Sequence, residues 1–292
     1  MPVSTRIALV TCPEIPDLDP DDQPLIGHFA QVGVEATPAI WSNPAVDWDS
    51  FDLVIIRNTW DYTDHLPTFL SWVKSLGSTV RNSAEIISWS SNKIYLHDLV
   101  GAGIPVIDTQ FVSDLQQTWI VPPAADYVVK PSMSAGSRDT LRLSGSDSGT
   151  VQAAQNLIDL IVAAGKKAMI QPYLDRVDTD GETALLYIDG QYSHAIRKGP
   201  LLHKDIEIER VHGLYLEEEI TARLPRADQR KLADHVMGYV AKRFDAPLYA
   251  RIDLVDNQAG EPVVLEVEAV EPSMFFGTQP TSYEWFVQVS LS

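Results

Sequence analysis

Three carboxylates near the C-terminal end of the chain have a spacing that suits metal binding. Glu266 and Glu268 flank one residue in an apolar run, and alternate side chains of a β-strand share one face. Asp253 lies in the preceding apolar run, and the turn residues between the two runs predict a hairpin over residues 249–268. Buried carboxylates need a raised pKa, a basic partner or a bound cation. All-oxygen ligands favour Mg2+ or Mn2+ over zinc, whereas a solvated acidic hairpin is the alternative interpretation.

Two lysines could bind the phosphates of a nucleotide. The start signal at Ser91 predicts a helix over residues 93–100, which places Lys93 in the first turn, where a cation is disfavoured unless an anion lies nearby. An apolar strand ends at Lys130. The loop after it consists of small residues whose backbone N–H groups could wrap an anion, namely Ser134, Ala135, Gly136 and Ser137. We therefore predict a phosphate-binding loop, with an ordinary hairpin turn as the alternative.

Other cations offer contacts for a substrate carboxylate. Arg57 directly follows a predicted strand and could bind a carboxylate through two of its nitrogens, although an ion pair with Asp61 is equally compatible with the sequence. Residues 181–198 predict a second hairpin, with Asp-Gly at its turn. Arg197 and Lys198 lie at the far end of this hairpin. They are the other candidates for a catalytic role.

Two further segments could complete a nucleotide site. The predicted strand 168–174 could offer backbone groups to an adenine ring, and the carboxylate of Asp178, which follows it, suits the ribose hydroxyls. Residues 199–219 have no firm periodicity, which is more typical of a lid than of a core element.

The elements that must position these residues begin with a small α/β unit. Apolar periodicity in the first 90 residues predicts strands at 6–11, 34–41 and 51–56 and helices at 21–32 and 64–76. This order is typical of an open α/β domain, in which ligands collect beyond the carboxyl ends of the strands. Further along the chain, the pattern predicts helices at 150–164 and 226–244 and a strand that begins at 105–107.

Composition narrows the class of partner. The 292 residues are 45% hydrophobic, so the chain can bury a sizeable core, and a formal charge of -18 argues against nonspecific binding to nucleic acid or an anionic membrane. Cys12 is the only cysteine, which excludes an intrachain disulfide and a cysteine zinc site. No apolar run has the length of a signal peptide core or a membrane span, and we expect a cytoplasmic protein.

These elements, in this order, resemble the ATP-grasp superfamily from about residue 91 to the C-terminus, and residues 1–90 are similar to the α/β domain that usually precedes that fold. Within the superfamily, the chain resembles the glutathione-synthetase-like branch that includes the D-cycloserine biosynthetic ligase, which cyclises O-ureido-D-serine. The strings that carry this likeness are Arg57-Asn-Thr-Trp60, Val129-Lys-Pro131, Gln171-Pro-Tyr-Leu174, Gly181-Glu-Thr183, Tyr192-Ser-His-Ala-Ile196, Lys198-Gly199, Arg251-Ile-Asp-Leu-Val255, Leu265-Glu-Val-Glu268 and Glu271-Pro-Ser273.

The resemblance implies an α/β (α+β) architecture with three parts. These are an N-terminal domain over residues 1–90, a small α+β subdomain over 91–172 and a large one over 173–292, with the nucleotide between the last two. It implies ATP as substrate, two Mg2+ ions with Mn2+ able to substitute, a small amino-acid-derived carboxylate and amine as partners, and a homodimer.

The resemblance also implies roles for single residues. Lys93 and Lys130 would hold phosphates under the 134–137 loop, and Asp253, Glu266 and Glu268 would hold the metal ions. The remaining nucleotide contacts would come from Gln171, Pro172, Tyr173, Leu174, Asp178 and Glu182. Arg197, with Lys198 and Arg57, would stabilise the reacting carboxylate. Many members of the family have asparagine where this chain has Glu268.

The implied reaction is ATP-dependent joining of a carboxylate to an amine through an acyl phosphate. The nucleophilic nitrogen belongs to the same molecule in a cyclising ligase such as one acting on O-ureidoserine, and to a second molecule in a dipeptide or glutathione-synthetase-like ligase. Two alternatives are a nucleotide-binding module without chemistry and a small-molecule kinase.

Overall fold

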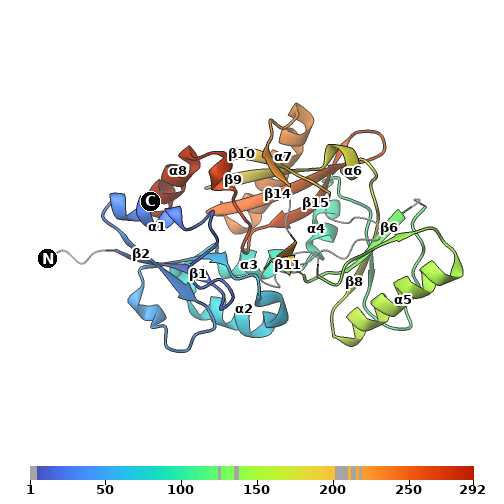
Figure 1. The fold of residues 1–292 in the computed structure, drawn as a ribbon, viewed down its shortest axis with the longest axis horizontal. Coiled ribbons are helices and arrows are strands. Elements are labelled where there is room, and N and C mark those ends of the chain that lie inside the picture. Colours follow the sequence, from blue (N-terminus) through green and yellow to red (C-terminus); the bar gives the residue numbers. More distant parts are fainter. Residues whose placement is uncertain (1–4, 124–125, 135–137, 201–209, 212–214, 217–218) are drawn as a thin grey trace.

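The computed structural model describes residues 5–292 except 124–125, 135–137, 201–209, 212–214 and 217–218. Its main sheets follow one another along the chain in three groups, one within residues 6–81, one within 110–172 and one within 182–268. The first and second groups lie at opposite ends of the molecule, with the third between them (Figure 1). The predicted boundaries at residues 90 and 172 fall between these groups, and the division into domains stays a prediction.

The N-terminal sheet is parallel and has the strand order β2-β1-β3-β4. Its strands are β1 (Arg6–Thr11), β2 (Glu35–Ile40), β3 (Leu53–Asn58) and β4 (Val80–Arg81). The helices of this region are α1 (Pro24–Gln31), α2 (Leu66–Ser75) and α3 (Ala84–Ser90). The predicted open α/β unit is therefore confirmed. The sequence analysis did not predict α3, which starts at a capping serine, Ser83.

The second sheet is antiparallel and has the order β5-β8-β6-β7. It consists of β5 (Gln110–Val112), β6 (Asp126–Pro131), β7 (Leu141–Ser144) and β8 (Ala168–Pro172). One face is covered by α5 (Ser148–Ala163), whose buried residues pack with those of β6 and β8. Lys130 therefore stands near the end of a central strand of this sheet, as the sequence predicts.

The central sheet is antiparallel, with the order β13-β10-β9-β14-β15. Its strands are β9 (Glu182–Ile188), β10 (Gln191–Lys198), β13 (Ile220–Ala222), β14 (Tyr249–Asp256) and β15 (Pro262–Glu268). Asp189 and Gly190 both have positive φ between β9 and β10, which is the backbone that a tight hairpin requires. Both predicted hairpins are thus confirmed.

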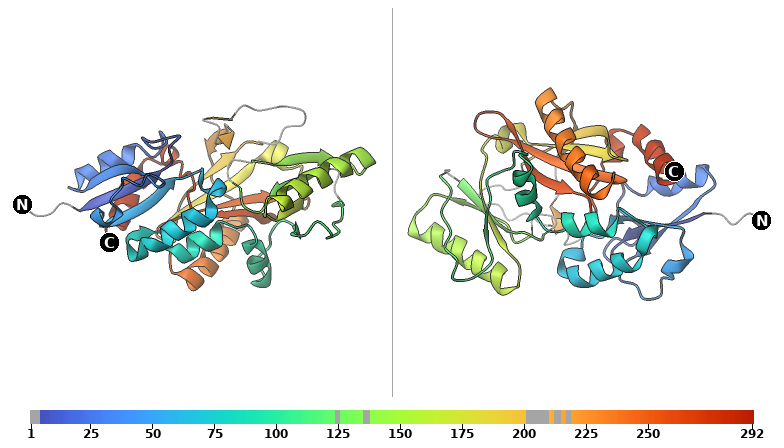
Figure 2. Two further views of the ribbon diagram at one scale, coloured as in Figure 1. Left: turned by 90° about the horizontal axis from the view of Figure 1, so that it is seen from below. Right: turned by 180° about the vertical axis from the view of Figure 1, so that it is seen from behind.

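The two faces of the central sheet have different partners. One face packs against α7 (Ala227–Phe244), and the other packs against β1 and α1 of the N-terminal region and against α8 (Thr281–Ser290). Figure 2, in its right-hand view, shows α7 lying over the central sheet and α8 beside α1. Because strand side chains alternate between faces, each central strand sends alternate residues towards α7 and towards the N-terminal region.

Two sequence predictions differ from the structure, and a third lies mostly outside the described residues. The helix predicted at 93–100 is α4 (Tyr95–Gly101), so Lys93 precedes the helix instead of lying in its first turn, as expected where the helix dipole disfavours a cation. Residues 105–107 form one isolated bridge, Val106 with Val264, and no strand. The predicted lid, 199–219, lies mostly outside the described residues, which include two short strands, β11 (Arg210–Val211) and β12 (Tyr215–Leu216).

A short helix, α6 (Val177–Asp180), connects β8 to β9. No helix in the described part of the chain has the combination of length and apolarity that crossing a membrane would need.

Candidate functional site

The three predicted carboxylates come together on one face of the central sheet. In the pairing of β14 with β15, Asp253 lies opposite Glu266, and Arg251 lies opposite Glu268. These residues share the face that turns towards the N-terminal region, because the alternate residues Ile252 and Val267 belong to the core under α7. The sequence-predicted acidic cluster is therefore real, and an arginine stands within it.

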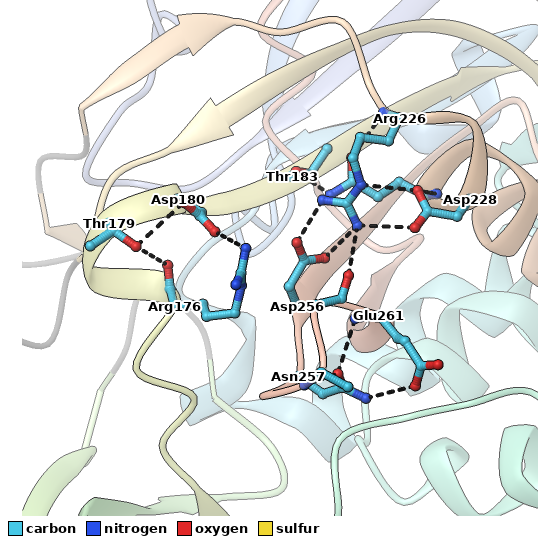
Figure 3. A network of polar contacts seen from close by, with 12 residues as sticks. Arg176, Thr179, Asp180, Thr183, Arg226, Asp228, Asp256, Asn257 and Glu261 are labelled. Atoms are coloured by element: carbon cyan, nitrogen blue, oxygen red, sulfur yellow. Dashed lines mark hydrogen bonds and ion pairs between the residues drawn. The ribbon is translucent and has the colours of Figure 1, made fainter.

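The opposite end of this hairpin is held by a network of polar contacts (Figure 3). Arg226, just before α7, donates to Asp256 through two nitrogens at 2.6 and 3.0 Å and to the carbonyl of Gly260 at 3.2 Å. The side-chain oxygen of Asn257 accepts from the backbone N–H groups of Ala259 and Glu261. This network fixes the turn, and a register shift between Asp253 and Leu254 then places Asp253 opposite Glu266.

Arg251 is the functional candidate that the sequence analysis missed. Its guanidinium donates to both oxygens of Asp253, at 2.8 and 3.0 Å, to Glu268 at 2.5 Å and to the carbonyl of Ser273 at 3.3 Å. A simple signal could have found it: Arg251 stands two residues before Asp253 on one strand, so the two side chains must share a face.

Lys198 enters the same cluster from the neighbouring strands. Its ammonium lies 3.2 Å from Asp253 and 3.3 Å from Glu182. Asp253 is only 1% exposed, and this burial alone would raise its pKa, but Arg251 and Lys198 hold the pKa at about 2. Asp253 is therefore ionised at neutral pH, and the structure brings the predicted residues Lys198 and Glu182 together beside it.

Lys93 joins the cluster to the start of the predicted phosphate loop. Its ammonium lies 2.8 Å from Glu266 and donates to the carbonyl of Ser134 at 3.0 Å. Burial works against the charge of Glu266, but Lys93 and Lys130 lower the pKa of this carboxyl. Of the loop, Ser134 is described, whereas Ala135, Gly136 and Ser137 lie outside the described residues.

Lys130 has no carboxylate ion-pair partner among the described residues. Burial, together with the positive charges of Lys93 and Lys198, lowers its pKa to about 8, although Glu266 and Glu182 act in the opposite direction. A cation in this position gains stability from an added anion. The three lysines and Arg251 thus place four cations among the carboxylates, and Lys130 is the one for which an added anion would supply a missing ion-pair partner.

The carboxylate oxygens of Asp253, Glu266 and Glu268 are ligands of the kind that Mg2+ prefers, but in this structure they pair with the chain's own cations. Within the described residues no three acidic, histidine or cysteine side chains form a ready metal site. Asp253 and Glu268 are paired with Arg251, and Glu266 is paired with Lys93. Burial and the nearby Glu266 and Asp253 raise the pKa of Glu268 to about 7, against the effect of Arg251. A cation would relieve this repulsion after a rearrangement of these pairs.

The predicted adenine and ribose residues lie at the end of the second sheet. Gln171 is buried and donates to the Thr109 hydroxyl at 2.8 Å, while Pro172 ends β8 just before Tyr173 and Leu174. The Asp178 carboxylate is engaged by Arg142 and by the Tyr173 hydroxyl, and the Arg142 guanidinium lies 3.5 Å from the centre of the Tyr173 ring. Contact between Asp178 and a ribose would therefore compete with Arg142.

Arg57 does not lie where a substrate could reach it. The side chain is 0% exposed, forms an ion pair with Asp22 at 3.1 Å and donates to the carbonyl of Pro272 at 2.9 Å. The alternative pair with Asp61 is also absent, since Asp61 accepts from the Trp41 indole instead. The prediction of a carboxylate-binding Arg57 is corrected: this arginine joins the N-terminal region to the segment after β15.

Arg197 also lies away from the cluster. It donates to the carbonyls of Thr179 and Asp180 at the end of α6, and its guanidinium lies 3.5 Å from Glu219. Its cross-strand partner, Thr183, faces α7, where its hydroxyl accepts from Gln229. Arg197 is thus on the α7 face, which does not support the predicted contact with a reacting carboxylate.

Comparisons with known proteins agree with this fold. Residues 7–82 match a family model described as the N-terminal domain of D-cycloserine synthetase DcsG. The chain is 33% identical over 281 residues to the cycloserine biosynthesis protein DcsG of Streptomyces lavendulae, with 92% of each chain covered.

Solved structures extend the comparison. The crystal structure of D-cycloserine synthetase DcsG matches with a TM-score of 0.87 at 29% identity and 98% coverage of both chains. A RimK-domain ATP-grasp protein from Sphaerobacter thermophilus matches with a TM-score of 0.68 at 15% identity, covering 99% of this chain and 100% of that one. The D-alanine–D-alanine ligase of Bacillus anthracis matches at 0.66 and 15%, covering 99% and 96%. The last two likenesses show the fold alone, which is the predicted ATP-grasp fold.

Proposed function

Because the chain belongs to the family of the cycloserine biosynthesis protein DcsG, we propose that it is an ATP- and Mg2+-dependent ligase that activates the carboxylate of a small amino-acid derivative. The observation that carries this proposal is a carboxylate cluster on one face of the central sheet, which Arg251 and Lys198 share and which Lys93 contacts from outside that sheet, with Lys130 on β6 as the remaining cation. Phosphoryl transfer to a carboxylate needs such an arrangement, since both reactants are anions.

We assign the contacts with ATP, Mg2+ and the substrate from the position of each residue in the site. Lys93 and Lys130 would hold the ATP phosphates, with Gln171, Pro172, Tyr173 and Leu174 around the adenine and Asp178 near the ribose. Asp253, Glu266 and Glu268 would hold Mg2+, which supplies charge neutralisation on the phosphates when bound. Arg251 and Lys198 would orient the substrate carboxylate, the role that the sequence analysis gave to Arg197, Lys198 and Arg57.

The reaction would proceed in two steps. A carboxylate oxygen attacks the γ-phosphorus of ATP, the bond from that phosphorus to the ADP oxygen breaks, and an acyl phosphate forms. A nitrogen lone pair of the substrate then attacks the acyl carbon, the C–O bond to phosphate breaks, and the nitrogen loses a proton. Arg251 would stabilise the oxyanion between attack and departure. By family membership, we propose O-ureido-D-serine, whose nucleophilic nitrogen lies in the same molecule, as the substrate to test first.

A substrate screen tests the proposal. Purified protein is incubated with ATP, Mg2+ and either O-ureido-D-serine alone or pairs of amino acids, and ADP release is followed together with the product mass. We expect ADP release with O-ureido-D-serine alone and a cyclic product. Turnover only with paired amino acids would support intermolecular ligation, and a stable phosphorylated product would indicate a kinase. No ADP release with any substrate would contradict the ligase proposal. The proposed homodimer is checked separately by sedimentation.

A further inference from the structure

The segment that follows β15 is held by side chains at four successive carbonyls. The donors come from the N-terminal region and from the central sheet: Trp60 to Glu271 at 3.2 Å, Arg57 to Pro272 at 2.9 Å and Arg251 to Ser273 at 3.3 Å, with the His194 ring nitrogen 3.0 Å from Met274. Side-chain donors at consecutive carbonyls fix the backbone tightly. The segment 271–274 is therefore a rigid wall of the candidate site.

Glu271 is the exception within this segment. The residue is 8% exposed, yet its carboxylate has no hydrogen bond or ion pair among the described residues. Burial, followed by the charge of Glu268, raises its pKa well above the ordinary value, while Lys93 and Arg251 act against this. Glu271 lies three residues after Glu268, and the carbonyls of Glu271 and Ser273 are held by Trp60 and Arg251. A largely buried carboxylate without a partner gains stability when a cation binds beside it, and the Glu271 oxygens are not among the fully enclosed unpartnered atoms.

Tyr62 approaches the same place from the N-terminal region. It begins the short 3-10 helix η2 (Tyr62–Asp64) and is 5% exposed. Its pKa is raised well above the ordinary value, first by burial and then by Glu271, Glu266 and Glu268 in that order. Tyr62 also belongs to the same buried core cluster as Val270, the residue directly before Glu271. In the described part of the chain, the Tyr62 hydroxyl has no hydrogen-bond partner.

We propose that Glu271 and Tyr62 bind the ammonium group of an amino-acid substrate whose carboxylate lies at Arg251 and Lys198. The inference rests on the proposed function, because it assigns the carboxylate end of that substrate to the two cations. An ammonium group donates three hydrogen bonds, and the two side chains supply a carboxylate and a phenolic oxygen as acceptors. Mg2+ suits the place less well, since it demands near-octahedral oxygen geometry and keeps several waters, whereas Glu271 and Tyr62 offer one carboxylate and one phenol.

This arrangement determines specificity rather than chemistry. Trp60 and Arg57 fix the backbone of Glu271 from the N-terminal region, and Tyr62 comes from that region as well. The amino group would thus be recognised between the N-terminal region and the central sheet, while the substrate carboxylate would contact Arg251 and Lys198. A carboxylic acid without an amino group would leave Glu271 unpartnered and would bind more weakly.

Calorimetry with matched ligands tests the proposal. Wild-type protein with Mg2+ and a non-hydrolysable ATP analogue is titrated with O-ureido-D-serine and with 3-(ureidooxy)propanoate, which lacks the amino group, and with D-serine, L-serine and D-alanine beside their deamino analogues. We expect a preference of about 10- to 100-fold for at least one amino compound over its partner, the range of a charge-assisted hydrogen bond. Glu271→Gln should abolish the preference, and Tyr62→Phe should reduce it. Glu284→Gln, an exposed glutamate on α8, is the matched control.

The outcomes separate this inference from the proposed function. The inference is overturned if the wild type binds the amino compounds no more tightly than their deamino analogues. It is also overturned if Glu271→Gln weakens the binding of an amino compound and of its deamino analogue equally. A fall in Mg2+ affinity in that variant with the preference intact would make Glu271 a metal ligand instead. ADP release is measured independently: in an active enzyme Glu271→Gln should raise KM with little change in kcat. A wild type that releases no ADP but keeps the Glu271-dependent preference would refute the ligase and leave this inference standing.

Discussion

Arg197 and Lys198 are neighbours in the sequence, but they lie on opposite faces of the central sheet. Lys198 contacts Asp253 and Glu182, whereas Arg197 donates to carbonyls at the end of α6. Strand alternation makes this separation unavoidable, because one residue of any adjacent pair must face away from the site.

Replacing Lys198 and replacing Arg197 should therefore have very different effects on kcat. We expect Lys198→Ala to lower kcat about 100- to 1,000-fold, the usual cost of removing one electrostatic contact to a reacting group, and Arg197→Ala to change kcat by less than about threefold. ADP release with the substrate found in the screen measures both. If Arg197→Ala is as impaired as Lys198→Ala, then Arg197 contacts the reacting atoms as the sequence analysis predicted.

Local patterns predicted much of this fold and site, and long-range contacts account for most of the rest. The acidic hairpin and Lys130 follow from strand period and turn residues, which are properties of short segments. Arg57 could not be placed in this way, because its carbonyl partner in Pro272 lies 215 residues further along the chain. Choosing between Arg197 and Lys198 required knowing which face α7 covers, and only the packed structure shows that.

The pH dependence of ATP binding should reflect the protonation of the Lys130 side chain. Its pKa of about 8 in the free protein would rise when phosphates bind, so binding favours the protonated form. Nucleotide affinity should be greatest well below pH 8, about half of that maximum at pH 8 and about tenfold lower at pH 9. Nucleotide titrations between pH 7 and 9.5 measure this dependence. Lys130→Arg keeps its charge throughout and should remove the pH dependence; an unchanged profile in that variant would assign it to another group.

The chemical step should require the planar guanidinium of Arg251, with its several N–H donors, and not only its positive charge. Arg251→Lys keeps the positive charge but cannot hold Asp253 through two nitrogens while also contacting Glu268. We expect kcat to fall about 100-fold or more, with the nucleotide Kd changed by less than about threefold. If Arg251→Lys keeps the wild-type kcat, then a positive charge at this position is sufficient for the chemical step.

Metal binding should depend on Glu266, which the structure pairs with Lys93. Glu266→Gln removes a charged oxygen ligand, so the Mg2+ concentration that gives half-maximal activity should rise about tenfold or more. Glu261→Gln, at the exposed turn of the same hairpin, is the control and should behave as wild type. Unchanged ATP turnover in Glu266→Gln at low Mg2+ would remove this residue from the metal site.

Arg57 should contribute to stability more than to catalysis. The side chain is fully buried between Asp22 and Pro272, with its guanidinium 5.0 Å from the centre of the Tyr249 ring. Arg57→Leu leaves the Asp22 charge buried without this partner, and we expect the free energy of unfolding to fall by about 3 kcal/mol. Urea denaturation measures this change.

An exposed arginine provides the comparison for that experiment. Arg243 pairs with Asp98 on the surface, and its side chain is 44% exposed, so Arg243→Leu should change the free energy of unfolding by about 1 kcal/mol or less. A double variant, Arg57→Leu with Asp22→Leu, should recover part of the lost stability, because it removes both buried charges together. If Arg57→Leu is as stable as wild type but has lost ligase activity, then Arg57 acts on the substrate despite its burial.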